Sequence, residues 1–341
     1  MTDEAARQAA PAEVDVVAGL RGLGMLEPGE EPDLEALSGG VSSEIWRVRT
    51  VRGDLCVKRA LGRLKVAALW EAPLERSHHE AEWMRVAGAI RPANVPQLLG
   101  EDEARRLVVM RYLSPADHRL WKVMLRDGEA DPGFAAEVGR TVAAIHAATA
   151  GNAAIARRFA TDAAFHALRL EPYLESTARV HAEVADRLMQ LSRTTAATRL
   201  ALVHGDVSPK NILAGPRGPV LLDAECAWYG DPAFDLAFVL NHLLLKCLWT
   251  PGAVDGFAAC FRTLIDAYVV GVTWEPAATI EARIAALLPG LMLARIDGKS
   301  PVEYINDDTQ RNRVRGFAVP LLKHPAPRPS EIAELWVTEI R

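Results

Sequence analysis

Residues 203–213 read VHGDVSPKNIL, and residues 221–223 read LLD. The first stretch supplies the Asp206 carboxylate and the Asn211 amide, and the second ends an apolar run with the Asp223 carboxylate. Between them, a GPRG turn joins two short β-like runs, which predicts a β-hairpin. We therefore expect two acids and one amide to face a common point.

This set of groups is typical of sites that transfer a phosphoryl group from a nucleotide, where catalysis consists of positioning and charge neutralisation. Asp206 would accept and orient the attacking hydroxyl. The Asn211 amide oxygen and the Asp223 carboxylate would hold Mg²⁺ against the phosphates, because that ion prefers hard oxygen ligands. A surface turn with incidental acids contains the same residue types, but the fixed order that includes His204 and Gly205 makes a chance match rare.

A glycine-rich segment precedes the first clear strand-like run, at 44–51. Its backbone N–H groups and hydroxyls can cover nucleotide phosphates. An ordinary hairpin turn uses the same residue types, which is the alternative. The residues expected to contact the phosphates are Gly39, Gly40, Ser42 and Ser43.

The next strand-like run carries a lysine. Alternation places Lys58 on the face opposite Val57, so its ammonium can reach a cleft. An isolated lysine on a strand is usually a solvated edge charge. A lysine between a glycine loop and an acidic helix, however, is where a lysine that binds the α/β-phosphates belongs. The helix offers Glu80 and Glu82 on different faces, and we expect Glu80 to pair with Lys58; the alternative is a solvated helix charge.

Together these residues resemble the aminoglycoside phosphotransferase and choline kinase superfamily, whose fold is similar to that of eukaryotic protein kinases. The resemblance extends from about residue 34 to beyond the segment GDPAFDLA at 230–237. Within the superfamily, DAECAWYG at 223–230 looks like the Asp-x-Glu metal segment of methylthioribose kinases. RIDG at 295–298 resembles their substrate-side stretch, where those enzymes usually carry two adjacent arginines and this chain has Ala294 first.

The resemblance implies roles for further residues. Glu225 would join the metal shell, unless it is an ordinary exposed acid beside Asp223. Arg295 would contact the acceptor. His204 and Asp235 would be structural, with Asp235 accepting hydrogen bonds that hold the catalytic loop.

The segment between the lobes would bind adenine through its backbone. By resemblance, the Arg111 carbonyl and the Leu113 amide would make the hydrogen bonds, and Met110 would flank the pocket. An ordinary edge strand is the alternative for this segment.

The expected fold is α+β and bilobal, like a protein kinase. Residues 1–112 would form an N-lobe, a small antiparallel sheet with one helix against it. Residues 113–341 would form a larger, mainly helical C-lobe with the catalytic loop, the metal site and the acceptor pocket; the turn-rich segment at 114–117 marks a hinge. Other expected elements are strands at 55–60 and 106–112, a helix before the sheet with Val14, Val17, Leu20 and Leu23 on one side, and helical sequence at 134–148 and 162–192.

Composition excludes several classes of protein. The 341 residues include 39 Lys and Arg against 44 Asp and Glu, a net charge of −5, and no long basic run. We therefore expect neither nucleic acid nor a membrane as the main partner. No apolar stretch reaches the roughly 20 residues of a membrane span. The four cysteines lack zinc-site spacing and the N-terminus lacks a signal pattern, so we expect reduced thiols and a cytoplasmic protein.

Two absences favour a small acceptor over a protein substrate. Gly205 replaces the arginine of many protein kinases, and residues 224–234 contain neither Asp-Phe-Gly nor Ala-Pro-Glu. We expect ATP- and Mg²⁺-dependent phosphorylation of a hydroxyl on a small metabolite, such as a pentose, a methylthioribose-like sugar or an amino alcohol. The alternatives are an aminoglycoside antibiotic phosphotransferase and a non-catalytic nucleotide-binding regulator. The sequence leaves open the acceptor, ATP or GTP, direct ligation by Glu225, and the oligomeric state, which includes a homodimer.

Overall fold

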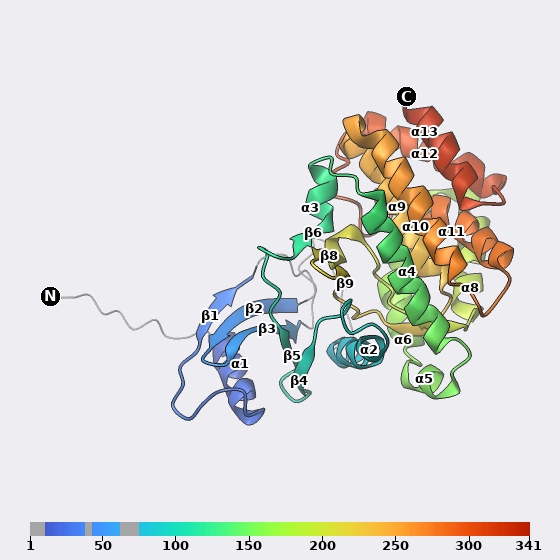
Figure 1. Cartoon of the computed structure of the whole chain (residues 1–341). Helices are drawn as coiled ribbons and strands as arrows, with labels where there is room; N and C mark the ends of the chain where they lie inside the picture. The colour runs from blue at the N-terminus through green and yellow to red at the C-terminus, as the bar shows by residue number, and fades with distance from the viewer. Residues whose placement is uncertain (1–10, 38–42, 62–74) are drawn as a thin grey trace.

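The N-lobe is built on a five-stranded antiparallel sheet. The computed structural model describes residues 11–37, 43–61 and 75–341 of the chain (Figure 1). The strands lie in the order β1-β2-β3-β5-β4, and each neighbouring pair is antiparallel. Their bounds are β1 (Asp33–Ala36), β2 (Ser43–Thr50), β3 (Gly53–Ala60), β4 (Leu98–Asp102) and β5 (Leu107–Arg111).

Two helices pack on opposite faces of this sheet. Helix α1 (Pro11–Gly22) covers the face that carries Val57. Helix α2 (Arg76–Ile90) covers the face that carries Val108, and it lies between the sheet and the C-lobe (Figure 1). Lys58 pairs with Val108 across β3 and β5, so it lies on the α2 face, as the alternation predicts.

The buried side of α1 differs from the prediction at one position. Val16 and Leu20 are fully buried, whereas Val14 is 55% exposed. Val16 lies four residues before Leu20 and therefore shares its face, whereas Val14 lies six residues before it and points elsewhere. The sequence-based choice of Val14 as a packing residue is therefore wrong.

The C-lobe follows a turn-rich segment at 112–118 and is mainly helical. The hairpin predicted at 211–223 is confirmed: β8 (Ile212–Gly215) and β9 (Gly218–Leu221) pair, and the short β6 (Arg119–Leu120) extends them. A second pair, β7 (Ala201–Val203) with β10 (Trp228–Gly230), was not predicted, because three-residue strands carry too little alternation to read. The helices are α3 (Trp121–Arg126), α4 (Pro132–Thr149), α5 (Ala153–Arg158), α6 (Asp162–Phe165), α7 (Ser176–Val180), α8 (Ala185–Ala197), α9 (Ala233–Trp249), α10 (Val254–Val270), α11 (Ala277–Asp297), α12 (Asp308–Lys323) and α13 (Pro329–Ile340), with shorter or irregular turns η1 (His166–Glu175), η2 (Ala182–Val184), η3 (Pro209–Asn211) and η4 (Pro251–Ala253).

The predicted helical segment at 162–192 is broken into several elements. Its centre, η1, is a π-helix that contains Pro172. Proline removes a backbone donor and clashes with the preceding turn, so regular α-helical bonding cannot continue through it. A further break follows at His181, after which η2 leads into α8.

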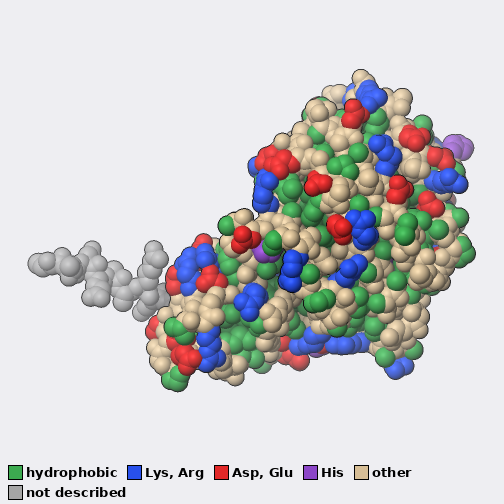
Figure 2. Space-filling view, in the orientation of Figure 1, with side chains coloured by type: hydrophobic (Ala, Val, Ile, Leu, Met, Phe, Trp, Pro, Cys, Tyr) green, Lys and Arg blue, Asp and Glu red, His purple; other side chains and the backbone are tan. Residues whose placement is uncertain are grey.

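Helix α9 is the central element of the C-lobe. Every residue from Ala233 to Leu248 is buried, including several polar ones. Helix α11 is long and apolar enough to cross a membrane by length and composition alone, but it packs inside the C-lobe core. On the face drawn in Figure 2, acidic and basic side chains are interspersed among the others.

Asn94 connects the two lobes. It lies between α2 and β4, and its side-chain Nδ2 donates to the Pro219 carbonyl at 2.7 Å. Its own carbonyl accepts from the Leu221 N–H at 2.9 Å. The hairpin that leads to Asp223 is therefore tied directly to the N-lobe.

Candidate active site

The catalytic loop begins where β7 ends and turns sharply at Gly205. This glycine has φ +80°, and a Cβ there would lie 2.6 Å from the Cys226 carbonyl oxygen. Only glycine fits such a position without strain. The buried Asp235 carboxylate accepts from the His204 and Gly205 N–H groups, each at 2.8 Å, which is the supporting contact expected for Asp235. His146 lies 3.3 Å from the same carboxylate.

The Asp206 carboxylate is buried and held by two cations. Its Oδ2 lies 2.9 Å from Arg169 Nη2 and 3.1 Å from Lys210 Nζ. In the part of the chain that the structure describes, its Oδ1 has only a long contact of 3.5 Å, from the Ser208 hydroxyl. Burial would raise the pKa of Asp206, but Lys210 and Arg169 outweigh burial and hold that pKa below its usual range. The group is thus a carboxylate at neutral pH with one oxygen available.

Asn211 and Asp223 are brought together by the hairpin. The Asn211 Nδ2 donates to the Asp206 carbonyl at 3.1 Å, and the Asn211 carbonyl accepts from the Leu222 N–H at 2.8 Å. These contacts leave the Asn211 side-chain oxygen as an acceptor. Asp223 has φ +68°, a conformation that aspartate tolerates better than most residues.

Lys58 links Asp223 to the N-lobe. Its Nζ lies 2.8 and 2.7 Å from the two Glu80 carboxylate oxygens and 2.5 Å from Asp223 Oδ1. Burial alone would lower the pKa of Lys58, but Asp223 and Glu80 outweigh it and raise that pKa. Burial would raise the pKa of Asp223, but Lys58 and, less strongly, Lys210 outweigh burial and lower it. Lys58 and Asp223 therefore stay ionised, whereas burial outweighs Lys58 at Glu80 and raises the pKa of that carboxyl to about 7. The triad spans both lobes.

Glu225 lies beside this triad and pairs with Arg76. The Arg76 Nε lies 3.0 Å from Glu225 Oε2, and both residues are buried. This ion pair also joins the lobes, because Arg76 begins α2. A metal role for Glu225 stays a prediction.

His204 is packed rather than exposed to a substrate. Its ring meets the Trp83 ring edge-on at 4.8 Å, and its Nδ1 accepts from the Asp206 N–H at 3.2 Å. Burial lowers the pKa of His204. The neutral imidazole thus supports the loop from the side of Trp83.

The segment between the lobes flanks a cavity of about 960 Å³. Arg111 and Leu113 contribute to its lining, whereas the Met110 side chain is buried in the core between α2 and the sheet. The described lining does not reach Lys58 or Asp206, so this cavity is separate from the charged groups. Adenine binding by these three linker residues stays a prediction.

The remaining predicted nucleotide contacts fall at the start of β2. Gly39, Gly40 and Ser42 lie outside the described residues. Ser43 is the first residue of β2, is buried, and pairs with Ala60 of β3.

Arg295, the predicted acceptor contact, is buried at the C-terminal end of α11. Its Nη1 donates to the Ser300 carbonyl and lies 2.9 Å from the Ser300 hydroxyl and 3.3 Å from the Tyr173 hydroxyl. The same Tyr173 ring lies under Arg169, whose guanidinium carbon is 5.9 Å from the ring centroid. Arg295 therefore reaches the Asp206 region through one aromatic ring.

Sequence reasoning missed four residues of this site. Lys210 lies within the quoted loop, four positions after Asp206, where helical spacing could have signalled the pair. Arg169, His146 and Arg76 lie in helical segments without a motif, so no local signal marks them.

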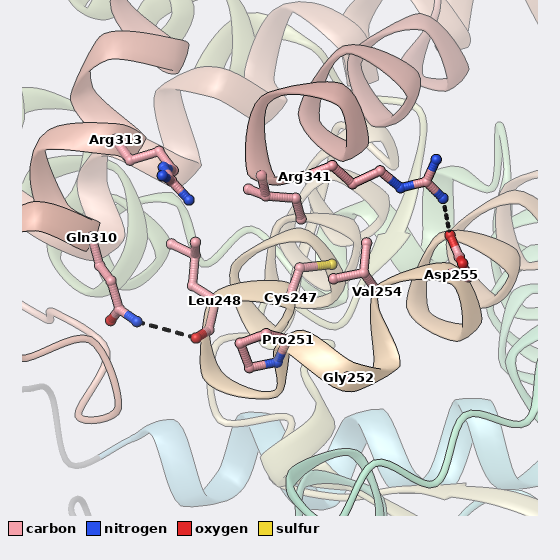
Figure 3. Close-up of a pocket in the computed structure, with 10 residues that line it drawn as sticks. Cys247, Leu248, Pro251, Gly252, Val254, Asp255, Gln310, Arg313 and Arg341 are labelled. Carbon is pink, nitrogen blue, oxygen red and sulfur yellow. Dashed lines mark hydrogen bonds and ion pairs between the residues drawn. The ribbon is translucent and has the colours of Figure 1, made fainter.

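A smaller cavity of about 350 Å³ lies at the C-terminal end of α9, the end away from Asp235 (Figure 3). Its wall includes Cys247, Leu248 and Val254, and Gln310 donates to the Leu248 carbonyl at 3.1 Å. An Arg341–Asp255 ion pair closes one side (Figure 3). These groups lack a nucleophile–base arrangement, so we assign no chemistry to this cavity.

Comparison with known proteins identifies the family. Residues 33–278 match the model of the phosphotransferase enzyme family. The chain belongs to this family. This phosphotransferase is 25% identical over 288 residues to the methylthioribose kinase of Yersinia pseudotuberculosis serotype O:3 (strain YPIII), an alignment that covers 74% of this chain and 68% of the relative.

Solved structures share the fold of this phosphotransferase. Choline kinase LicA from Streptococcus pneumoniae superposes with a TM-score of 0.54 at 15% identity, covering 92% of this chain and 99% of that chain. Amicoumacin kinase hAmiN, solved with AMP-PNP, Ca²⁺ and Ami, has a TM-score of 0.53 at 14% identity and covers 96% and 100%. The expected superfamily, bilobal fold and class, a small-molecule kinase, are confirmed.

Proposed function

We propose that this phosphotransferase uses ATP and Mg²⁺ to phosphorylate a hydroxyl group of a small metabolite, with Asp206 as the catalytic base. The observation that carries the proposal is the convergence of Asp206, Asn211 and Asp223 from the C-lobe with Lys58 from the N-lobe. A non-catalytic regulator has no need of a buried, oriented carboxylate beside the nucleotide groups.

The geometry of Asp206 supports its role. Arg169 and Lys210 hold Oδ2, which leaves Oδ1 to accept the proton of the acceptor hydroxyl. Because the pKa of Asp206 is held low, the carboxylate orients the hydroxyl throughout the reaction and takes its proton late.

The donor set fits a hard divalent cation. Among the described residues, the Asn211 side-chain oxygen and the Asp223 oxygen that does not contact Lys58 are placed to ligate it, and Glu225 stays a predicted further ligand. When bound, the cation neutralises phosphate charge. Lys58, held by Glu80, would move from Asp223 onto phosphate oxygens, and Lys210 would face the developing charge beside Asp206.

The acceptor is proposed to be sugar-like. The likeness to methylthioribose kinases supports this choice. The buried cation Arg295, whose hydrogen bonds go to Ser300 and Tyr173 rather than to a carboxylate, disfavours a polycationic aminoglycoside, because like charges repel. The four cysteines are free, which is compatible with the proposed cytoplasmic location. A homodimer stays a proposal, and sedimentation velocity tests it by measuring the oligomeric state.

The test is a screen of small-metabolite pools for phosphate incorporation from labelled ATP with Mg²⁺. Asp206→Asn should lower turnover by at least about 100-fold while nucleotide binding stays near that of the wild type. Asp266→Asn, on the exposed side of α10, is the matched control and should behave as wild type. Undiminished turnover in Asp206→Asn would remove Asp206 from the mechanism, and the absence of transfer to any pool would favour the regulator.

A further inference from the structure

One face of α9 runs from the catalytic loop into the C-lobe. Its residues recur every three or four positions, so they lie on the same side of the helix. Asp235 at the start holds the catalytic loop. The residues that follow on this face are Phe238, His242, Lys246 and Trp249.

Lys246, near the end of this row, carries a buried side-chain amine. The residue is 1% exposed, and its Nζ lies 4.2 Å from the Trp249 ring centroid and 4.7 Å from that of Tyr304. The two rings stack at 4.6 Å. Among the described residues, Nζ has no hydrogen-bond partner. A buried cation without a hydrogen-bonding partner is costly, so cation–π contact alone leaves it incompletely compensated.

Two further buried groups near Tyr304, one of the rings under Lys246, have donor atoms to spare. His242 contacts the Tyr304 hydroxyl through Nδ1 at 3.5 Å, but its Nε2 has no partner within the described chain. Arg295 uses Nη1 for Ser300 and Tyr173, but its Nε is likewise without a partner among those residues. Native structures rarely leave several neighbouring polar atoms unsatisfied without a reason.

The charge of this region is positive. Burial lowers the pKa of His242 well below its usual value, and the cations Arg295 and Lys246 lower it further. Glu303, a carboxylate near Lys246, is ion-paired with Lys122. Burial and Lys122 lower the pKa of Lys246 to about 7, and a bound anion would favour its protonated form, so the cluster defined by Lys246, His242 and Arg295 favours an anion over a neutral or cationic group.

Ring contacts connect this cluster to Asp206. The guanidinium carbon of Arg169, which holds Asp206, lies 5.7 Å from the Phe238 ring centroid. The Phe238 ring lies 5.6 Å from the His242 ring. The guanidinium of Arg295 lies 5.6 Å from the Tyr173 ring, which Arg169 also covers. A continuous run of side-chain contacts therefore joins the residues that hold the catalytic carboxylate to the cluster.

We propose that the acceptor of this phosphotransferase carries an oxyanion, a carboxylate or a phosphate, which Lys246, His242 and Arg295 bind while its hydroxyl lies at Asp206. The inference rests on the proposed function and narrows its substrate class to acidic hydroxy compounds. A neutral sugar would leave the buried ammonium uncompensated, whereas an oxyanion accepts charge-assisted hydrogen bonds from all three side chains.

The test compares three acids with their neutral counterparts: D-gluconate with D-glucose, D-glycerate with glycerol, and ribose 5-phosphate with ribose. Binding is measured by calorimetry, and transfer is measured as ADP release with ATP and Mg²⁺ at constant ionic strength. In at least one pair the acid should bind tenfold or more tightly than its counterpart. The pair that shows the preference distinguishes a carboxylate from a phosphate.

Variants assign that preference to the cluster. Lys246→Met should weaken binding of the preferred acid at least tenfold and change its neutral counterpart less than twofold, whereas Lys246→Arg should retain most of the preference. The exposed Lys323→Met is the matched control and should match wild type. Circular dichroism checks that each variant is folded. If Lys246→Met does not fold, the acid preference measured for Lys246→Arg decides the test.

The outcomes separate the inference from the function on which it rests. Three acids that bind no better than their counterparts, or equal losses for acid and counterpart in Lys246→Met, would overturn the inference. Phosphate transfer to neutral compounds alone would also overturn it while the kinase function stands. Acid-selective binding that depends on Lys246 supports it even if ADP release is absent, a result that would instead count against the proposed function.

Discussion

The Lys246 ammonium couples the stability of this protein to pH. Burial and, to a smaller extent, the neighbouring Lys122 outweigh Glu303 and lower the pKa of Lys246 to about 7. His242, Arg295, Trp249 and Tyr304 are the other groups that enclose this site. In the unfolded chain a lysine has a pKa of about 10.4.

The sign of the coupling follows from proton binding. Between about pH 7 and about pH 10.4, the unfolded chain binds a proton at Lys246 that the folded chain holds weakly. This residue therefore destabilises the fold increasingly as pH falls through that window.

Lys246→Met should accordingly stabilise the protein at pH 7, by roughly 1–3 kcal/mol, because it removes a buried donor without a partner. The difference from wild type should shrink as pH approaches 10. Urea unfolding at pH 7.0 and 9.5 measures both effects. The exposed Lys323→Met should show no such pH-dependent difference, and a Lys246→Met variant less stable than wild type at pH 7 would contradict the assignment.

At the scale of elements, the catalytic loop depends on one backbone conformation. Gly205 has φ +80° and is in close contact with the Cys226 segment, and its N–H donates to Asp235. Gly205→Ala adds a Cβ where the nearest atom is a backbone carbonyl, so the loop must shift.

We expect Gly205→Ala to lower the free energy of unfolding by about 2 kcal/mol or more and to reduce kcat, because Asp206 is the next residue. Gly316→Ala is the matched control: Gly316 is exposed within α12, has open space around it, and should gain about 0.5–1 kcal/mol. Thermal unfolding and initial rates measure both variants. Wild-type rates in Gly205→Ala would show that the loop tolerates the shift.

The elements also show what sequence can and cannot predict. The β8–β9 hairpin could be predicted because a glycine stands on each side of its two-residue turn. The orientation of Lys58 could be predicted because strand alternation fixes its face. The π-helix η1 was not readable as a break, because Pro172 was the only local sign within an otherwise helical pattern. Arg169 lies in that element, and its contact with Asp206 depends on tertiary packing that no local spacing encodes.

At the scale of the whole molecule, three N-lobe residues make polar contacts with the C-lobe beside the site. Lys58 reaches Asp223, Arg76 reaches Glu225, and Asn94 holds the β8–β9 hairpin. The first two bring an N-lobe cation to a C-lobe carboxylate, so a nucleotide and a cation that bind between them would join both lobes at once.

Binding of ATP with Mg²⁺ should therefore stabilise the whole molecule. At a nucleotide concentration 100-fold above Kd, the gain is about 2.7 kcal/mol, because only the folded state binds. Lys58→Met should lose more than half of the resulting rise in Tm, since it removes the cation proposed to contact the phosphates, and Asp223→Asn should lose the part that requires Mg²⁺. Differential scanning fluorimetry with ATP alone, Mg²⁺ alone and both measures these shifts, with Lys323→Met as the control lysine. A full shift in Lys58→Met would mean that the nucleotide binds without bridging the lobes through Lys58, and the proposed geometry of the phosphates would fail.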